Sequence, residues 1–289
     1  MTYAIIIPAH NEALFLPQCL AGINAQLHKP TAVIIVNDNS TDDTARIAEK
    51  ATEEYNYYTV VHRTSSSEHM PGSKVVHTFN TGLDNLNQEV DFIVKLDADI
   101  ILPPEYMLRI SEEFKKNTKL GIAGGFVYEK DEHGVWQLNH PMNKKHVRGA
   151  FKAYTNSCFT AIGGLKPAMG WDTVDELLAQ YQGFEIDTFT DLKAKHLRPT
   201  GKAYHKKAKL LQGKAMFTMR YGFLITLIAS LKMAFSQKKA IAFIDNMRGY
   251  FQAKQKKSPF LVSQKEGQFI RSYRWKGIKA SLFNFRFLL

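Results

Sequence analysis

The chain has 289 residues, 45% apolar and 22% charged, so it is long enough for one large globular domain or two moderate ones. Its 38 basic and 27 acidic residues give a net charge of +11, with the basic excess concentrated from Lys193 onward. That charge predicts an anionic partner: nucleic acid, anionic lipid or a phosphorylated substrate. Two cysteines argue against a disulfide framework, and the longest late apolar run, residues 221–231, is too short to span a bilayer.

Strands and helices alternate along the first hundred residues. Short apolar runs predict buried strands at residues 4–7, 32–36, 59–61 and 91–96. Segments with helical spacing of apolar residues lie between them, at residues 13–26, 40–55 and 73–86. In the second helix, Ser40 followed by Asp43 is typical of a helix start with Ser40 as the N-cap. This alternation predicts βαβ units and a mostly parallel sheet, an α/β fold.

The segment Asp97-Ala98-Asp99 directly follows the fourth predicted strand. In an extended segment, side chains two positions apart point the same way, so Asp97 and Asp99 would present carboxylate oxygens to one point. A hard divalent cation binds such oxygens together with phosphate and water. The alternative at this stage is a polar turn with no ligand.

Polar residues follow three of the predicted strands: His10, Asn11 and Glu12, then Asn37, Asp38 and Asn39, then Asp97 and Asp99. In open α/β sheets, ligands bind at the carboxyl ends of the strands, so these groups predict a ligand site. The sequence lacks both the Gly-x-Gly-x-x-Gly and the Gly-x-x-x-x-Gly-Lys-Ser patterns, which argues against a dinucleotide oxidoreductase and a P-loop enzyme.

Three motifs, in this order and spacing, resemble those of the family 2 glycosyltransferases of GT-A fold. They are Ile7-Pro8-Ala9-His10-Asn11-Glu12, Val36-Asn37-Asp38-Asn39-Ser40-Thr41-Asp42 and Asp97-Ala98-Asp99. The similarity extends to about Gly201. It implies a GT-A domain over residues 1–205, with a Rossmann-like nucleotide-sugar-binding half in residues 1–100. Residues 101–205 would form an acceptor and catalytic half with mixed strands.

The resemblance implies a role for each donor-side residue. Asp38 would accept a hydrogen bond from the uracil imide of a UDP-sugar, and Lys74 would lie near the diphosphate. The base and ribose would be lined by Pro8, Ala9, Asn11 and Glu12. One departure is Asn37, where the family often carries a second aspartate.

Metal binding is also implied by the resemblance. Asp99 would hold Mg²⁺ or Mn²⁺ on the diphosphate, while Asp97, next to Ala98, would lie nearer the ribose or in the second metal shell. His196 falls where related enzymes place a group near the metal or the diphosphate. The alternative for His196 is a structural hydrogen bond.

Two aspartates are candidates for the catalytic base. Asp172 matches the base aspartate of the family's Glu-Asp motif, in which Trp171 replaces the glutamate. Asp175 is one helical turn further on, on a similar face, and is the second candidate. Acidic residues are also favoured at any helix N-terminus by the helix dipole, so a structural role remains the alternative. Two short strands are expected next, at residues 184–189 and 191–195.

Residues 206–289 form a separate amphipathic helical region in this interpretation, rich in basic, aromatic and aliphatic residues. Such a mixture suits helices in a membrane interface, with cations toward anionic head groups. Packing on the catalytic domain and dimerisation are the alternatives; nucleic acid is disfavoured because no nucleic-acid-binding motif is present. We therefore expect a cytoplasmic enzyme at the inner face of the cytoplasmic membrane.

The predicted function is inverting transfer of a sugar from a nucleotide sugar, with UDP favoured, to a hydroxyl of a saccharide or lipid-linked glycan. The resemblance implies direct displacement with an aspartate base and a divalent metal. Three alternatives stay open: a sugar-nucleotide nucleotidyltransferase, a non-catalytic nucleotide-sugar-binding protein, and a basic scaffold for nucleic acid or membrane.

Overall fold

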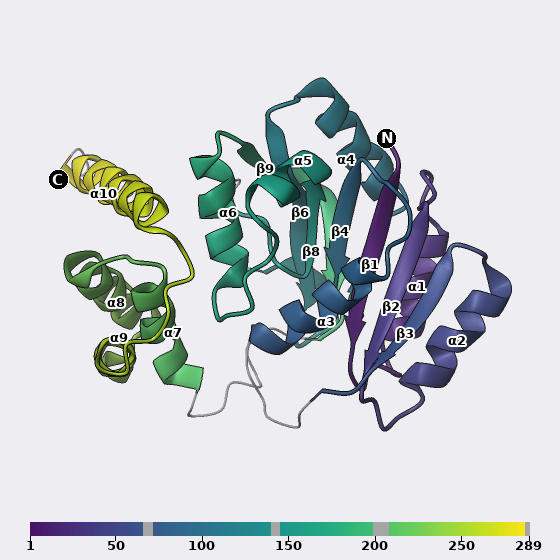
Figure 1. Ribbon diagram of the computed structural model, residues 1–289, viewed down its shortest axis with the longest axis horizontal. Coiled ribbons are helices and arrows are strands. Elements are labelled where there is room, and N and C mark those ends of the chain that lie inside the picture. Colours follow the sequence, from purple (N-terminus) through teal and green to yellow (C-terminus); the bar gives the residue numbers. More distant parts are fainter. Residues whose placement is uncertain (66–71, 140–144, 199–207, 287–289) are drawn as a thin grey trace. The chain divides into compact units, whose positions relative to one another are not determined.

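The computed structural model describes residues 1–65, 72–139, 145–198 and 208–286 (Figure 1). The chain divides into two compact units. The first contains residues 1–167 and 171–200, and the second contains residues 168–170 and 201–289. The boundary expected at residue 205 lies outside the described residues.

The first unit is built on one mixed β-sheet, with nine strands among the described residues. They are β1 (Tyr3–Ala9), β2 (Ala32–Asp38), β3 (Tyr58–Arg63), β4 (Phe92–Leu96), β5 (Ile100–Ile101), β6 (Leu120–Lys130), β7 (Trp136–Leu138), β8 (Phe151–Thr155) and β9 (Glu185–His196). Their order is β3-β2-β1-β4-β8-β6-β9-β5, with β7 paired to β6. The first four strands are mutually parallel, whereas β8 runs antiparallel to both β4 and β6.

Helices cover both faces of this sheet (Figure 1). They are α1 (Leu16–Asn24), α2 (Thr44–Glu54), α3 (Ser73–Asp84), α4 (Tyr106–Lys116), α5 (Asn156–Ala161) and α6 (Trp171–Tyr181). Side chains of α1 and α4 pack with alternate residues of β1, including Ile5 and Ile7, in the main core. On the opposite face α3 lies close to β1 and β2 because Gly82 has no side chain; a Cβ there would lie 2.5 Å from Ile6 Cγ2. Tight packing at Gly82 holds α3 against the middle of β1 and β2.

The sheet is parallel in its first half and mixed in its second half, which confirms the predicted α/β architecture. Two local predictions are wrong. The strands expected at 184–189 and 191–195 form the single strand β9, which stays paired with β6 across a register shift. The N-cap of α2 is Asp43, because the Ser40 hydroxyl instead accepts a hydrogen bond from the Asn11 N–H at 3.0 Å.

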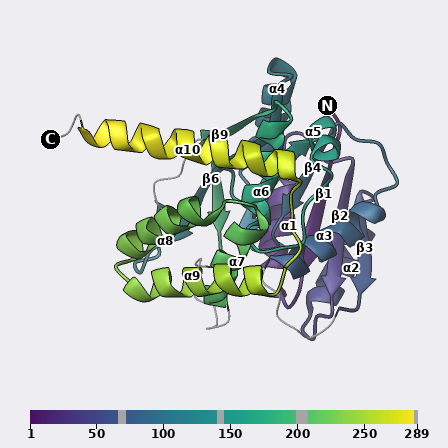
Figure 2. The same cartoon turned by 60° about the vertical axis from the view of Figure 1, so that its left-hand side comes forward.

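The second unit contains four described helices, α7 (Ala208–Thr218), α8 (Phe223–Gln237), α9 (Ala240–Gln255) and α10 (Gln264–Arg286). Helix α9 packs against both α7 and α8 (Figure 2). Helices α7 and α9 cross closely at Gly213 and Gly249, where there is no room for a side chain. A Cβ on Gly213 would lie 1.8 Å from the Asn246 carbonyl oxygen, and one on Gly249 would lie 2.0 Å from the Leu210 carbonyl oxygen. Arg274 on α10 donates to the Tyr221 hydroxyl at 2.6 Å.

Two further features concern the length of the helices and the state of the cysteines. Across the residues that the structure describes, no helix is both long enough and apolar enough to span a membrane. Both cysteines, Cys19 and Cys158, are free thiols and buried. Burial raises the pKa of each thiol, to about 12 for Cys158.

Candidate active site

The loops after β1 and β2 are tied together at the carboxyl edge of the sheet. The Thr41 N–H donates to Asn11 Oδ1 at 2.8 Å, and the Glu12 N–H donates to Thr44 Oγ1 at 2.7 Å. Asn11 and Asn39 both adopt left-handed backbone conformations, with φ of 56° and 57°. Such conformations cost energy in residues other than glycine and are concentrated at functional sites. The predicted convergence of these two strand ends is therefore present.

Asp38 is the last residue of β2 and is 2% exposed. Its Oδ2 lies 3.0 Å from the Thr78 hydroxyl and 3.4 Å from Arg63 Nη1. Its Oδ1 is buried and has no hydrogen-bond partner among the described residues. A buried oxygen without a donor is unfavourable, so Asp38 is suited to accept a hydrogen bond from a ligand.

The other donor-side candidates surround Asp38. Pro8 and Ala9 end β1 and pair with Val36 and Asn37 of β2. This pairing places their backbone next to Asp38. Lys74 is the second residue of α3, and its carbonyl lies one turn before Thr78, 2.9 Å from that hydroxyl. The structure thus brings Pro8, Ala9, Asn11, Glu12 and Lys74 to the same edge of the sheet as Asp38.

The segment Asp97-Ala98-Asp99 is a turn between β4 and β5, so the expected extended geometry is wrong. The Ile100 N–H bonds back to the Asp97 carbonyl oxygen at 3.2 Å. Asp97 is paired with Lys95, whereas the Asp99 carboxylate lies 3.4 Å from His196 Nε2 and 3.7 Å from Arg198 Nε. The turn gives the two aspartates different partners, and Ala98 between them is buried.

Asp99 and His196 form the part of the site suited to a metal. Burial raises the pKa of Asp99, but the hydrogen bond and charge of His196 and the charge of Arg198 outweigh it and lower that pKa. Burial alone would lower the pKa of His196, but Asp99 and Glu129 outweigh it and raise that pKa. Glu129 lies 3.0 Å from His196 Nδ1, an outer contact that commonly orients a metal-binding histidine through its second nitrogen.

No group of three or more histidine, cysteine, aspartate or glutamate side chains could hold a metal ion in the part of the chain that is described. Mg²⁺ sites in nucleotide enzymes commonly use only one or two protein ligands, completed by phosphate oxygens and water. The Asp99 carboxylate fits such a site, and the His196 imidazole nitrogen lies 3.4 Å from it. Asp97 fits it less well because its carboxylate is paired with Lys95.

Arg198 connects the first loop to this acidic turn. Its guanidinium pairs with Glu12, 186 positions earlier in the chain, and with Asp99. Burial raises the pKa of Glu12 to about 7; Arg198 lowers it, and the charges of Asp99 and Asp97 raise it. The pKa of Glu12 therefore depends in part on the charges of the Asp97–Asp99 turn.

Two buried lysines face each other across β4 and β8, where Lys95 and Lys152 are register partners. Their exposed fractions are 2% and 0%. The Lys95 ammonium lies 5.2 Å from the centroid of the Trp171 ring, and that of Lys152 lies 5.9 Å from it, distances typical of cation–π contacts. Trp171, the first residue of α6, thus joins the helix to β4, the strand that precedes Asp97.

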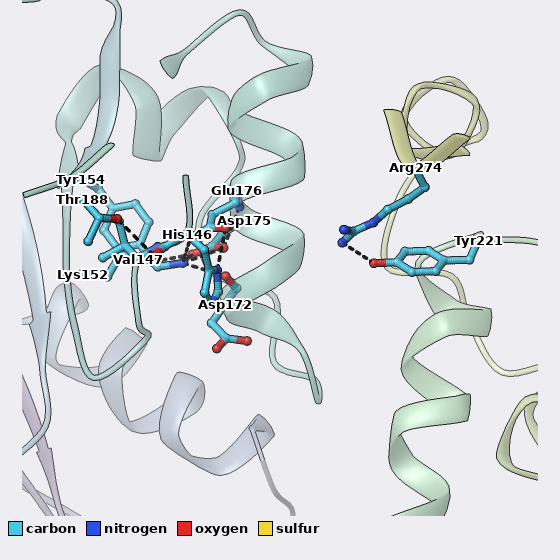
Figure 3. A network of polar contacts seen from close by, with 10 residues as sticks. All are labelled: His146, Val147, Lys152, Tyr154, Asp172, Asp175, Glu176, Thr188, Tyr221 and Arg274. Carbon is cyan, nitrogen blue, oxygen red and sulfur yellow. Dashed lines mark hydrogen bonds and ion pairs between the residues drawn. The ribbon is translucent and has the colours of Figure 1, made fainter. Parts of the chain in front are cut away.

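The two candidate bases differ in accessibility (Figure 3). Asp172 is half-buried in the first turn of α6, and its carboxylate is directed away from the buried cluster. Asp175 is 1% exposed and lies 3.1 Å from Lys152 Nζ and 2.5 Å from the Tyr154 hydroxyl. Burial raises the pKa of Asp175 to about 6, with Lys152 opposing that rise. Asp175 is therefore unsuited to meet an acceptor hydroxyl, and Asp172 is the better candidate.

Asp172 lies close to the Asp97–Asp99 turn through one short loop. The Asp97 N–H donates to the Ala150 carbonyl oxygen at 2.7 Å. A Cβ on the neighbouring Gly149 would lie 3.1 Å from Asp172 Cβ and 2.8 Å from the Trp171 ring. The backbone of Asp97 and the Cβ of Asp172 thus lie beside consecutive residues, Ala150 and Gly149, of one loop.

Comparison with known proteins assigns this arrangement to a family. Residues 4–169, more than half of the chain, match the model of glycosyl transferase family 2. The chain belongs to glycosyltransferase family 2. The matched residues include the strand ends and the loop at Gly149, and end just before α6.

Known relatives and solved structures align with parts of this glycosyltransferase. Poly-beta-1,6-N-acetyl-D-glucosamine synthase of Staphylococcus epidermidis is 24% identical over 122 residues, covering 42% of this chain and 27% of the synthase. Among solved structures, S. aureus TarS 1–349 in complex with UDP-GlcNAc aligns with a TM-score of 0.57 at 18% identity, over 76% of this chain and 65% of that one. The mannosyltransferase PcManGT from Pyrobaculum calidifontis, with GDP-Man and Mn²⁺, aligns with a TM-score of 0.57 at 16% identity, over 96% and 80%. At these identities the structural matches show the GT-A fold.

Several residues of this glycosyltransferase site were not singled out from the sequence. Lys95 and Lys152 each interrupt an otherwise apolar or aromatic strand, which is the one local signal that could have identified them. Arg198 and Glu129 gave no such signal, because their partners Glu12 and His196 are far away in the sequence.

Replacing Gly149 with alanine in this glycosyltransferase is expected to lower kcat with little loss of nucleotide affinity. A new Cβ would lie 2.8 Å from the Trp171 ring, closer than real Cβ contacts come, and 3.1 Å from Asp172 Cβ, closer than most of them come. Displacements of this size can cost about 10²-fold in rate. The check is steady-state turnover alongside UDP affinity. Gly277→Ala is the control, because a Cβ there would meet nothing within 4 Å and Gly277, like Gly149, has no positive φ.

Proposed function

We propose that this family 2 glycosyltransferase moves a sugar from a nucleoside-diphosphate sugar, UDP favoured, to an acceptor hydroxyl with inversion at the anomeric carbon. The observation that supports it most is the position of Asp172. The first turn of α6, which carries this accessible carboxylate, packs beside Gly149, and the next residue, Ala150, accepts a hydrogen bond from the N–H of Asp97 in the acidic turn. A proton acceptor beside a diphosphate-binding edge is the arrangement that single displacement requires.

Donor binding would depend on Asp38 and the acidic turn. The Oδ1 atom of Asp38 would accept the uracil imide N–H, and the loop from Pro8 to Glu12 would line the base and ribose. The titles of two structural neighbours name UDP-GlcNAc and GDP-Man as their ligands, which supports a nucleotide-sugar donor. Lys74 at the start of α3 would lie toward the diphosphate.

Asp99 and His196 would hold Mg²⁺ or Mn²⁺, with Asp97 near it. When bound, the ion would supply positive charge and Lewis acidity at the diphosphate. Glu129 would keep the His196 ring oriented through Nδ1. Arg198, paired with Asp99 and Glu12, would add positive charge at the same edge.

The chemical step would be carried by Asp172. Its carboxylate would take the proton of the acceptor hydroxyl as that oxygen attacks the anomeric carbon from the face opposite the leaving diphosphate. A general base acts in this way when it lies within hydrogen-bond reach of the proton. Lys152 would hold the first turn of α6 in place, because its ammonium donates a hydrogen bond to the Asp172 carbonyl oxygen at 2.7 Å.

The test is a thermal-shift comparison of UDP and GDP, each with and without Mn²⁺, on the wild type and Asp99→Ala. We expect UDP with Mn²⁺ to give the largest rise in Tm, since a ligand at 100 times its Kd stabilises by about 2.7 kcal/mol. Asp99→Ala is expected to lose the Mn²⁺-dependent part alone. Glu105→Ala, in the turn before α4, is the control because Glu105 is an exposed acid.

A larger response to GDP would contradict the base preference, and an equal Mn²⁺ effect in Asp99→Ala would contradict the metal assignment. Turnover of UDP-sugars separates the alternatives. Release of UDP supports transfer, whereas pyrophosphate formed from a nucleoside triphosphate would indicate a nucleotidyltransferase. Binding without any turnover would indicate a non-catalytic binding protein.

We further propose that the acceptor is a cell-envelope saccharide or lipid-linked glycan, met at the inner face of the cytoplasmic membrane. The name of the related poly-beta-1,6-N-acetyl-D-glucosamine synthase supports a polysaccharide product. Because the alignment covers 27% of that synthase, the linkage and the sugar are left open.

A further inference from the structure

Helix α8 carries apolar side chains around most of its circumference, including its exposed side. Its fully buried positions include the hydroxyl residues Thr226 and Ser230, both 0% exposed. Its outward positions carry large apolar side chains: Phe223 46%, Leu224 59%, Leu231 41% and Phe235 80% exposed. In a helix of a water-soluble domain the apolar stripe normally faces the core. On α8 only Ile225 among the large apolar residues is fully buried, and four large apolar side chains face outward instead.

The buried side of α8 confirms that this orientation is unfavourable for packing alone. Ser230 Oγ is buried and has no hydrogen-bond partner among the described residues, whereas Thr226 donates within the helix to the Gly222 carbonyl oxygen at 2.8 Å. A buried unpaired hydroxyl costs about 1–3 kcal/mol. The fold therefore keeps α8 in an orientation that exposes large apolar side chains to an external environment.

Helix α9 extends the same surface. Ile241, Ile244 and Phe251 are 49%, 45% and 49% exposed. The rings of Phe223 and Phe251 lie 6.0 Å apart, which joins the two helices. We call these seven side chains the apolar patch: Phe223, Leu224, Leu231, Phe235, Ile241, Ile244 and Phe251.

The charge of this unit indicates which partner the patch fits. Residues 201–289 contain 19 of the 38 basic residues but 2 of the 27 acidic ones, so residues 1–200 are net acidic. Lys232, Lys238 and Lys239 are exposed on or directly after α8, beside the patch. Exposed aromatic and aliphatic side chains flanked by lysines match the interface of an anionic bilayer. A second copy would bring two strongly basic units together, and nucleic acid would leave the apolar side chains without a partner.

We propose that the apolar patch inserts into the head-group region of a bilayer containing anionic lipid, with the adjoining lysines on the lipid phosphates. The enzyme binds the membrane surface through α8 and α9 without spanning it. This goes beyond the transfer reaction and rests on none of its catalytic residues. It supplies a physical basis for an acceptor presented at a membrane.

The test is co-sedimentation of the full chain with vesicles of phosphatidylcholine alone and with added phosphatidylglycerol. We expect binding to the anionic vesicles, and a loss of at least about tenfold in Leu231→Ser/Phe235→Ser, since each side chain would leave an apolar environment. Leu27→Ser/Val135→Ser is the matched control, because those residues are 67% and 53% exposed in the first unit. It is expected to bind like the wild type.

Three results would overturn the proposal. They are no sedimentation with anionic vesicles, equal binding by the wild type and the patch variant, and a patch variant that differs from the wild type by its oligomeric state in light scattering. The UDP-dependent rise in Tm is measured on every variant. A variant that keeps that rise but loses vesicle binding supports the patch, and loss of the rise in the wild type concerns the transfer proposal alone.

Discussion

Asp172→Asn is expected to lower kcat by about 10²–10⁴-fold, the range that a positioned general base contributes. The change keeps the size and the backbone of the side chain, so the hydrogen bond from Lys152 to the Asp172 carbonyl oxygen remains. It replaces the basic carboxylate with a neutral amide, which cannot take the proton of the acceptor hydroxyl. Nucleotide affinity is expected to stay nearly unchanged, because Asp38 and Asp99 lie on other elements. Single-turnover rates and UDP titrations, measured on the same preparation, check both expectations.

The matched control is Asp84→Asn, which removes an exposed aspartate at the end of α3. It is expected to turn over like the wild type. Near-normal turnover in Asp172→Asn would show that another group takes the proton. An equal loss in kcat and in UDP affinity would indicate that Asp172 acts through the donor site.

Lys152→Met is expected to reduce the free energy of unfolding by about 3–5 kcal/mol, the usual cost of removing one partner from a buried ion pair. Lys152 is 0% exposed, and its ammonium lies 3.0 Å from Glu176 and 3.1 Å from Asp175. Desolvation alone would lower the pKa of Lys152, but these acids raise it, so the lysine is charged in the fold. Its loss would leave two carboxylates in the interior without their cation. Urea unfolding followed by circular dichroism measures the change.

Lys119→Met is the control, since Lys119 is exposed before β6 and its loss is expected to change stability by less than about 1 kcal/mol. Combining Lys152→Met with Asp175→Asn and Glu176→Gln removes all three charges and is expected to recover part of the stability. If the single variant unfolds at the urea concentration of the control, the network contributes little to folding.

The elements that the sequence predicted well are those whose pattern is local. Apolar runs, broken only by Lys95 in β4, predicted β1, β2 and β4, and the polar residues that follow predicted the edge where Asp38 and Asp99 lie. The predicted ends of the helices and strands were less accurate. Helix α2 starts at Thr44 because the Ser40 hydroxyl is used by the neighbouring loop, a contact between residues 29 positions apart.

The electrostatic part of the site could not be derived from local pattern, because its pairs are distant in sequence. Glu12 and Arg198 are 186 positions apart, and Lys152 and Asp175 are 23 apart on a strand and a helix. Spacing along α6 made Asp175 a second candidate beside Asp172. The contact with Lys152 on β8 shows that Asp175 is buried in an ion pair, whereas Asp172 remains accessible.

The two sequestered sulfur atoms have a practical consequence. Since Cys19 and Cys158 are buried and their thiols hold their protons more tightly than usual, the folded protein should react slowly with maleimides. A cysteine introduced in place of Phe235 would then be the preferred attachment point for a nitroxide or fluorophore. Quenchers dissolved in the lipid tails could read the immersion depth of that one label without any change to the native background.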